Sequence, residues 1–330
     1  MLKRRHLIAG LAGATLASPL AAPRVARAQD AYPNKSVKLI VPWPPGGGVD
    51  LFARVIQAPL GAQLGQTVIV ENIGGSSGRV GTLAASRAQP DGYTFALVND
   101  TFAATEALPI PGAPALYPSF APVSLAISGP QGLFTHPRSD IATVQAFAAA
   151  AKANPGKLNI GVPGLGSSQH LTSELMLRAA GDLRVTHVPY RGGGPALQDL
   201  ISGNIDGVVV TFAAGAQQAR AGQLVALAVT SAQRFPTFPN VPTAGETIAP
   251  GFVQATWQGL LAPKGTPAAA QAKIHAALVA VLKDKAVSDR LAELGFDPVG
   301  LDGKDFGKLF GTTVDTFAGI AKERNIAAGD

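Results

Sequence analysis

The chain of 330 residues contains no cysteine, and charged (15%) and aromatic (6%) residues are few. The absence of cysteine excludes disulfides, thiolate metal ligands and a thiol nucleophile. Basic residues are scattered rather than gathered in a run with interleaved aromatics, so we expect no nucleic-acid partner. No Gly-Lys-Ser/Thr phosphate loop occurs, and no Gly-x-Gly-x-x-Gly follows an apolar run. The sequence therefore predicts a protein without a cofactor.

Long apolar runs are also missing, except near the N-terminus. Lys3 to Arg5 precede an apolar, small-residue run from Leu7 to about Ala22, and Ala26 to Ala28 form a small-x-small site. This order is typical of an export signal, which we place at residues 1–28 with cleavage near Ala28. Twin-arginine and general secretory export both stay open, as does an uncleaved anchor. The segment holds five basic residues and no acid, so its removal lowers the formal charge from +6 by five, to +1.

Short β-like runs alternate with alanine-rich helical stretches, which predicts an α/β fold with mainly parallel sheets. The predicted strands are 37–41, 67–71, 93–98, 123–127, 132–135, 158–162, 185–188, 207–211, 224–229 and 256–261. The predicted helices are 49–64, 79–88, 141–153, 168–180, 194–202, 214–221, 267–282, 286–294 and 303–325.

Two irregular, proline-containing segments, 109–122 and 235–250, suggest where the chain passes between domains. Each lies shortly before an apolar run, and we place the crossings near 125–131 and 253–259. Lobe I would then be discontinuous, and the predicted ranges are 29–127 and 256–330 for lobe I and 128–255 for lobe II.

Three consecutive glycines, Gly46 to Gly48, follow the predicted strand 37–41 and precede a helix. Glycine lets a ligand approach the backbone, and the start of a helix offers free N–H groups to an anion. The pattern indicates a carboxylate cradle, or a tight turn ordered by Asp50. Similar turns recur at 74–78, 164–168 and 191–194, and we expect them to meet across one cleft, because ligands of open α/β sheets bind outside the carboxyl ends of strands.

Several ordered motifs resemble the substrate-binding receptors of tripartite tricarboxylate transporters, often called Bug receptors. The matching motifs are Leu39-Ile-Val-Pro-Trp-Pro-Pro-Gly-Gly-Gly-Val-Asp50, Gly65-Gln-Thr-Val-Ile-Val-Glu-Asn72, Gln89-Pro-Asp-Gly-Tyr-Thr94, His187-Val-Pro-Tyr-Arg-Gly192, Pro195-Ala-Leu-Gln-Asp-Leu200, Leu227-Ala-Val-Thr-Ser231, Asn240-Val-Pro-Thr243 and Trp257-Gln-Gly-Leu-Leu-Ala-Pro263. The resemblance covers the chain from about Tyr32 to Ile326.

The resemblance implies a type II periplasmic binding protein, with two doubly wound lobes joined by a hinge and the ligand cleft between them. It implies a monomeric periplasmic receptor, not an enzyme, that delivers a small organic acid to the membrane subunits of a tripartite tricarboxylate transporter. The ligand-binding residues carried over by resemblance are Trp43, Pro45, Gly46, Gly47, Gly48, Asp50, Ser76, Ser77, Arg79, Asn99, Thr101, Gly166, Ser167, Ser168, His170, Tyr190, Arg191, Gly192 and Thr211.

Departures from the family pattern refine the expected ligand. Arg79 replaces a usual asparagine and could pair with a ligand carboxylate. Asp206 is followed by Gly207-Val-Val-Val-Thr211, which lacks the acid that relatives often carry there. A ligand amino group would have no counter-charge, so we expect a plain carboxylate rather than an amino acid.

Other interpretations of these residues stay open. Gly74 to Gly78 match the Gly-x-Ser-x-Gly nucleophile pattern, so a secreted serine esterase using Ser76 is an alternative, with His136, His170, His187 or His275 as base. A receptor that serves a sensor kinase is another. Ser167 and Ser168 could cap a helix instead of binding ligand, and Arg191 could brace the surface between the lobes. No two histidines have helical i, i+4 spacing with an acid beside them, so we expect no zinc site.

Overall fold

The computed structural model describes residues 32–108, 110 and 112–327. The predicted export signal therefore lies outside the described residues. Within them, no helix combines the length and the apolar character needed to cross a bilayer.

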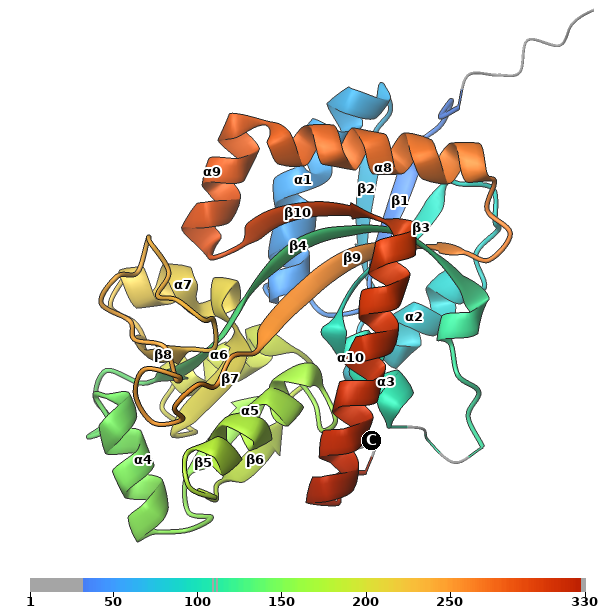
Figure 1. Cartoon of the computed structure of the whole chain (residues 1–330). Helices are drawn as coiled ribbons and strands as arrows, with labels where there is room; N and C mark the ends of the chain where they lie inside the picture. Colours follow the sequence, from blue (N-terminus) through green and yellow to red (C-terminus); the bar gives the residue numbers. More distant parts are fainter. Residues whose placement is uncertain (1–31, 109, 111, 328–330) are drawn as a thin grey trace, which may run out of the picture. The chain divides into compact units, whose positions relative to one another are not determined.

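The described chain alternates strands and helices as expected (Figure 1). The strands are β1 (Val37–Val41), β2 (Val68–Asn72), β3 (Thr94–Asn99), β4 (Phe120–Thr135), β5 (Asn159–Val162), β6 (Thr186–Pro189), β7 (Gly207–Thr211), β8 (Val225–Val229), β9 (Ala255–Pro263) and β10 (Asp297–Asp302). The helices are α1 (Gly48–Leu64), α2 (Arg79–Ser86), α3 (Asp100–Ala107), α4 (Val144–Ala153), α5 (Ser168–Ala179), α6 (Gly193–Ile201), α7 (Phe212–Arg220), α8 (Ala268–Lys283), α9 (Lys285–Leu294) and α10 (Gly303–Arg324), with short 3-10 turns at Ser76–Gly78 and Tyr117–Ser119.

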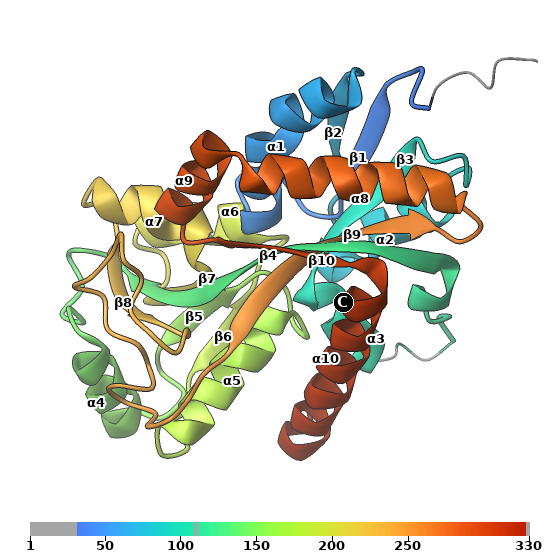
Figure 2. The same cartoon turned by 45° about the horizontal axis from the view of Figure 1, so that its top comes forward.

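The ten strands form one hydrogen-bonded sheet. Eight of them follow the order β2-β1-β3-β9-β4-β7-β5-β6, and β8 and β10 each pair with β4 outside this order. The pairs β1–β2, β1–β3, β5–β6 and β5–β7 are parallel. Every pairing of β4 and β9 is antiparallel. The expectation of mainly parallel sheets is therefore wrong, because two long strands in the middle run against their neighbours (Figure 2).

Strand β4 is sixteen residues long, and the sequence predicted two shorter strands in its place. Its first part pairs with β9 and β10, and its last part pairs with β7 and β8. Gly129 and Pro130 looked like a break, yet their registers with Thr256 and Ala255 continue the ladder. A side chain at 129 would lie 2.7 Å from the Gly295 carbonyl oxygen, which explains why glycine stands there. The division into lobe I and lobe II stays a prediction, and we use these names for the predicted ranges.

Two elements were not predicted. Helix α3 is only eight residues long and lies directly after β3, so Asn99-Asp100-Thr101 looked like a loop. Strand β10 contains Pro298 and Gly300 and is mostly exposed, so it shows no apolar alternation. Its extended form comes from antiparallel pairing with β4.

Local signals at helix ends behaved as expected. The Ser167 hydroxyl caps α5 by accepting the His170 N–H, and α4 ends at Ala153, where the predicted helix 141–153 ends. Helix α10 packs beside α3, where the Phe102 ring of α3 and the Phe310 ring of α10 have centroids 5.3 Å apart. These contacts fix the start of α3, which enters the site described next.

Candidate functional site

The Gly46–Gly48 turn links β1 to α1 and is held in place by hydrogen bonds to Asp50. One carboxylate oxygen of Asp50 accepts the Gly46 N–H at 3.0 Å. The other accepts from Arg54 Nε (3.2 Å) and Asn72 Nδ2 (3.0 Å). Because both oxygens are occupied and the side chain is buried, the geometry gives Asp50 the role of shaping the turn rather than touching an anion. The N-cap residue, Gly47, has no side chain to occupy the first amides of α1.

The four glycine turns converge, as the sequence predicted. A side chain at Gly164 would lie 2.3 Å from Ser77 Oγ, and one at Gly194 would lie 2.8 Å from the Pro45 carbonyl oxygen. A side chain at Gly48 would lie 2.8 Å from the Thr211 side chain. In each case the two partners come from different predicted lobes. Glycine permits this approach because it has no Cβ, so the backbones of the turns lie close to residues of the other predicted lobe.

Two cavities lie among these turns. The inner pocket is small, about 30 Å³, and is lined by Trp43, Gly47, Gly48, Val49, Asn99, Thr101, Pro163, Gln169, Gly193, Val210, Thr211 and Ala214. The outer pocket measures about 680 Å³ and is lined by Pro44, Pro45, Asn72, Gly74, Gly75, Ser76, Ser77, Gly164, Pro189, Tyr190 and Arg191. Both linings combine residues from the two predicted lobes.

Among the described residues that line the two pockets, Arg191 is the only charged one. It is exposed and forms no ion pair with any described residue. The neighbouring Tyr190 hydroxyl is already committed, because it donates to Asp199. Burial and the Asp199 carboxylate raise the pKa of Tyr190 to about 12, so it stays protonated. The outer pocket therefore offers an acid one free cation and no competing carboxylate.

The end of β3 and the start of α3 also reach the site, where Asn99 and Thr101 were predicted. Asn99 caps α3 by accepting the Thr101 N–H at 3.2 Å, and both residues line the inner pocket. Between them, Asp100 points away from the cavity and is completely buried. One of its oxygens accepts hydroxyl hydrogens from Ser168 (2.8 Å) and Thr256 (2.7 Å).

Burial raises the pKa of the Asp100 carboxyl to about 7, although the Thr256 and Ser168 hydrogen bonds act against this shift. Its second oxygen has no hydrogen-bond partner in the part of the chain that the structure describes. Ser168 and Thr101 also hydrogen bond with each other at 3.0 Å, which ties α3 to the start of α5. The sequence reasoning did not select Asp100, because nothing in a polar loop pattern distinguishes a buried carboxyl from an exposed one.

Several predicted site residues lie elsewhere. Arg79 donates to the Pro114 carbonyl oxygen at 2.6 Å and lines neither pocket, so the proposed pairing of Arg79 with a ligand is not supported by this geometry. Gly192 packs against Pro44, Ser167 caps α5, and Ser168 bonds to Asp100. The Gly166 N–H donates to His170 Nδ1 at 3.1 Å and so is already used. Gly46 packs beside Gly194 and lines two further cavities instead.

The geometry gives Ser76 no catalytic partner. Its hydroxyl makes no hydrogen bond within the part of the chain that the structure describes, and none of the four candidate histidines bonds to it. Another series, Ser173–His187–Glu174, has the connectivity of a catalytic triad, with distances of 2.9 and 3.2 Å. Ser173 is buried within α5, where backbone N–H groups are used by the helix and cannot stabilise an oxyanion.

The same region holds the one group of described residues with metal-ligand spacing, namely His170, Glu174 and His187. His170 and Glu174 are one helical turn apart on α5, and β6 supplies His187, which helical spacing alone did not reveal. A metal-binding histidine normally donates its second N–H to a neighbour. Here His170 Nδ1 accepts from Gly166, and Arg324 lies 3.8 Å from Glu174. Both features oppose a cation, so the cluster is better described as a hydrogen-bond network.

The site is thus a cleft of glycine turns and hydroxyls, with one arginine, Arg191, that forms no ion pair within the described part of the chain. Solved structures share this fold. One described as a periplasmic transporter superposes with a TM-score of 0.86 at 34% identity, covering 90% of this chain and 100% of the other. The periplasmic binding protein BugD gives 0.84 at 31% identity, covering 90% and 99%. An R. palustris protein solved with adipate gives 0.85 at 30% identity, also covering 90% and 99%.

Sequence comparison agrees with the fold. Residues 52–326 match the model described as the tripartite tricarboxylate transporter family receptor. BugT of Bordetella pertussis is 33% identical, with 95% of this chain and 94% of that protein covered. The chain belongs to this family of solute-binding receptors, which are not enzymes. Its α/β periplasmic binding-protein fold and its family are those that the sequence motifs predicted.

Proposed function

We propose that this receptor captures a small organic acid through a carboxylate and delivers it to the membrane subunits of a tripartite tricarboxylate transporter. The observation that carries the proposal is the convergence of four glycine turns on pockets where Arg191 is the only charged lining residue. Structures of relatives solved with adipate and with malate support a carboxylate ligand.

One carboxylate would occupy the inner pocket, beside the amides at the start of α1 and the hydroxyls of Thr101 and Thr211. The rest of the acid would extend into the outer pocket toward Arg191 and Ser76. Trp43 supplies the apolar wall of the inner pocket. Hydrogen bonds to charged groups contribute roughly 1.5–3 kcal/mol each, so a few of them are enough for micromolar binding, about −8 kcal/mol.

Closure of two lobes about β4 and β9 would remove the acid from water. The inner pocket is smaller than a dicarboxylate, so an acid must part the turns before they can close around it. The periplasmic relatives support a periplasmic location. In the proposed role the receptor reaches it by export, with the signal removed near Ala28, and acts there as a monomer.

A thermal-shift screen tests the proposal. Adipate, malate, citrate, benzoate and nicotinate are added separately, because a ligand that binds only the folded state raises the unfolding midpoint. Arg191→Ala should weaken binding of the best acid by about tenfold. Arg138→Ala, which removes an exposed arginine outside the two pockets, is the matched control and should leave the affinity unchanged.

Two results would contradict the receptor interpretation. The first is that no organic acid shifts the midpoint of the wild-type protein. The second is hydrolysis of p-nitrophenyl esters that Ser76→Ala abolishes, since a receptor with Ser76→Ala would still fold and bind.

A further inference from the structure

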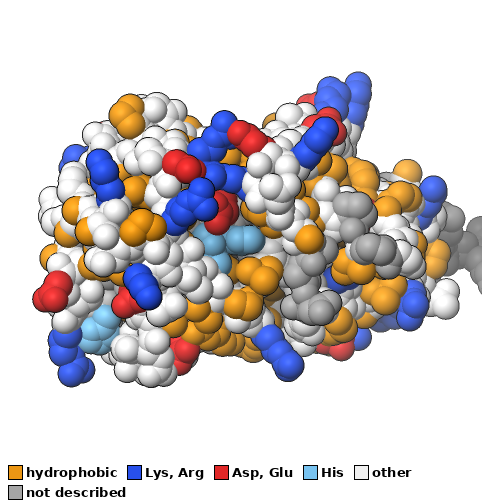
Figure 3. All heavy atoms as spheres, turned by 90° about the horizontal axis from the view of Figure 1, so that it is seen from below, with side chains coloured by type: hydrophobic (Ala, Val, Ile, Leu, Met, Phe, Trp, Pro, Cys, Tyr) orange, Lys and Arg blue, Asp and Glu red, His pale blue; other side chains and the backbone are white. Residues whose placement is uncertain are grey.

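The C-terminal helix α10, in predicted lobe I, packs against α5 of lobe II. Leu171 of α5 lies in one buried apolar cluster with Phe317, Ile320 and Ala321 of α10. Charged side chains extend this contact beyond the apolar cluster, where Arg178 pairs with Glu323. Figure 3 views the molecule from the side where α5 and the end of α10 lie in Figure 1, and shows acidic, basic and histidine side chains gathered together on it.

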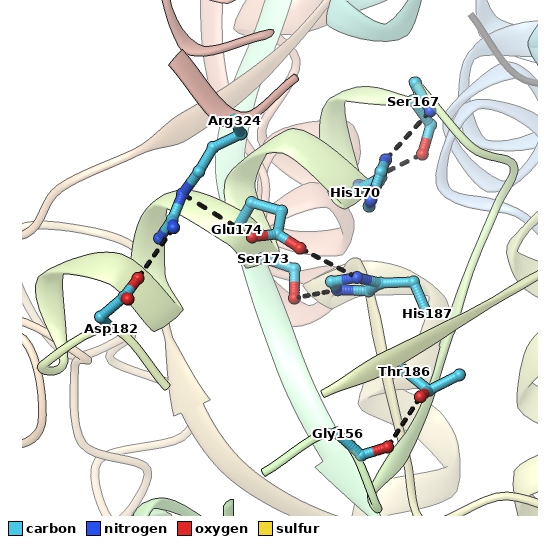
Figure 4. A network of polar contacts seen from close by, with 10 residues as sticks. Gly156, Ser167, His170, Ser173, Glu174, Asp182, Thr186, His187 and Arg324 are labelled. Carbon is cyan, nitrogen blue, oxygen red and sulfur yellow. Dashed lines mark hydrogen bonds and ion pairs between the residues drawn. The ribbon is translucent and has the colours of Figure 1, made fainter. Parts of the chain in front are cut away.

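Arg324, at the last turn of α10, faces two acids of lobe II (Figure 4). It donates from Nη1 to Asp182 at 2.8 Å, whereas its Nε lies 3.8 Å from Glu174 Oε2. That separation is too long for a hydrogen bond. Its Nε and Nη2 are buried and have no hydrogen-bond partner among residues 32–108, 110 and 112–327. Buried donors without acceptors are unfavourable, so a movement of about 1 Å that brings Nε onto Glu174 would be stabilising.

The Glu174 side chain is positioned for this contact by His187. Its other oxygen lies 3.2 Å from His187 Nδ1, and Ser173 Oγ lies 2.9 Å from His187 Nε2. The hydrogen bond from His187 lowers the pKa of Glu174, although burial acts against this shift, and the nearby Arg324 charge lowers the pKa further. The carboxylate is therefore ionised, and fixed in place, at neutral pH.

The same network reaches the ligand cleft. The rings of His170 and His187 pack edge to face with centroids 4.6 Å apart. His170 in turn accepts the Gly166 N–H, and the neighbouring Leu165 carbonyl accepts the Ser77 hydroxyl across the cleft at 3.2 Å. Contacts between packed groups thus run from the cleft turn at 164–166 through α5 to Arg324. Figure 4 shows the part of this series from His170 to Arg324.

We propose that Arg324 is an interlobe clasp, which pairs with Glu174 in the closed form and holds the lobes together. This inference rests on the proposed function, because it assumes that the lobes move. The clasp lies outside both pockets, so it controls closure without touching the ligand.

Spin labels test the clasp, because the chain has no cysteine of its own. Lys152→Cys on α4 and Lys304→Cys on α10 place one label on each lobe, away from Arg324. Pulsed EPR distances are measured without ligand and with adipate or malate, in Arg324→Ala and in Glu174→Gln. Glu174→Gln keeps the side-chain size and serves if Arg324→Ala folds poorly. Lys322→Ala removes an exposed charge from the same turn and is the control.

Both test variants should shift the distance distribution toward the open form, with and without acid. They should also weaken acid binding by about tenfold, chiefly through faster release, whereas Lys322→Ala should behave as wild type. Distributions of Arg324→Ala and Glu174→Gln that superimpose on wild type would overturn the clasp. If wild type binds no acid, the proposed function fails, and the ligand-free distances still decide whether the clasp exists.

Discussion

Asp100 gives a prediction whose size follows from the structure. Its carboxyl is completely buried, with one oxygen bonded to the Ser168 and Thr256 hydroxyls and the other unpartnered. Burial raises its pKa from 3.8 to about 7. The folded protein therefore prefers the neutral form. This preference stabilises the fold fully below pH 3.8, and the stabilisation is lost as pH rises through 7.

The magnitude follows from the two pKa values. A shift of about three units corresponds to about 4 kcal/mol between acid and alkaline limits. Of this loss of stability, about 2.5 kcal/mol occurs between pH 5 and pH 8. Asp100→Asn cannot ionise and keeps an oxygen for Ser168 and Thr256. Its buried amide adds a cost that does not depend on pH, so only the pH-dependent difference is informative.

Urea unfolding at pH 5 and pH 8 measures this difference. The unfolding free energy of Asp100→Asn relative to wild type should rise by about 2.5 kcal/mol over that interval. Asp315→Asn, which alters an exposed aspartate on α10, should show no such rise. Parallel pH profiles for wild type and Asp100→Asn would refute the argument that burial keeps this carboxyl neutral.

Three further substitutions test the cleft. Gly164→Ala should weaken acid binding as well as stability, because its side chain would meet Ser77. Gly181→Ala, also at positive φ but in open space, should reduce only stability. Equal acid affinities of the two variants would contradict the contact with Ser77. Ser76→Gly should raise the unfolding free energy by about 1 kcal/mol, because Ser76 has a left-handed backbone (φ 46°), and a loss in urea unfolding would contradict this. Arg79→Ala should leave the affinity for the best acid unchanged in titration calorimetry, since Arg79 binds Pro114, and a tenfold loss would restore it as a ligand partner.

The glycine turns show how far local sequence reasoning extends. Glycine has no Cβ, so a run such as Gly46 to Gly48 after a strand restricts the possible structures to a close backbone approach. The convergence of the turns was predictable because carboxyl ends of strands share one edge of a sheet. Which side chains face the pocket was less predictable. Arg79 and Arg191 look alike in sequence, yet one donates to a carbonyl and the other is free.

Contacts between residues that are far apart in the sequence were not predicted either. Asp100, Ser168 and Thr256 come from three separate elements, and His187 meets Glu174 from another strand. By itself, the sequence determined the α/β alternation, the helix ends and the family motifs, because these depend on periodicity and on neighbours along the chain. Only the tertiary structure decided the antiparallel centre of the sheet, the burial of Asp100 and the free state of Arg191, because burial and pairing depend on which distant segments pack against each residue.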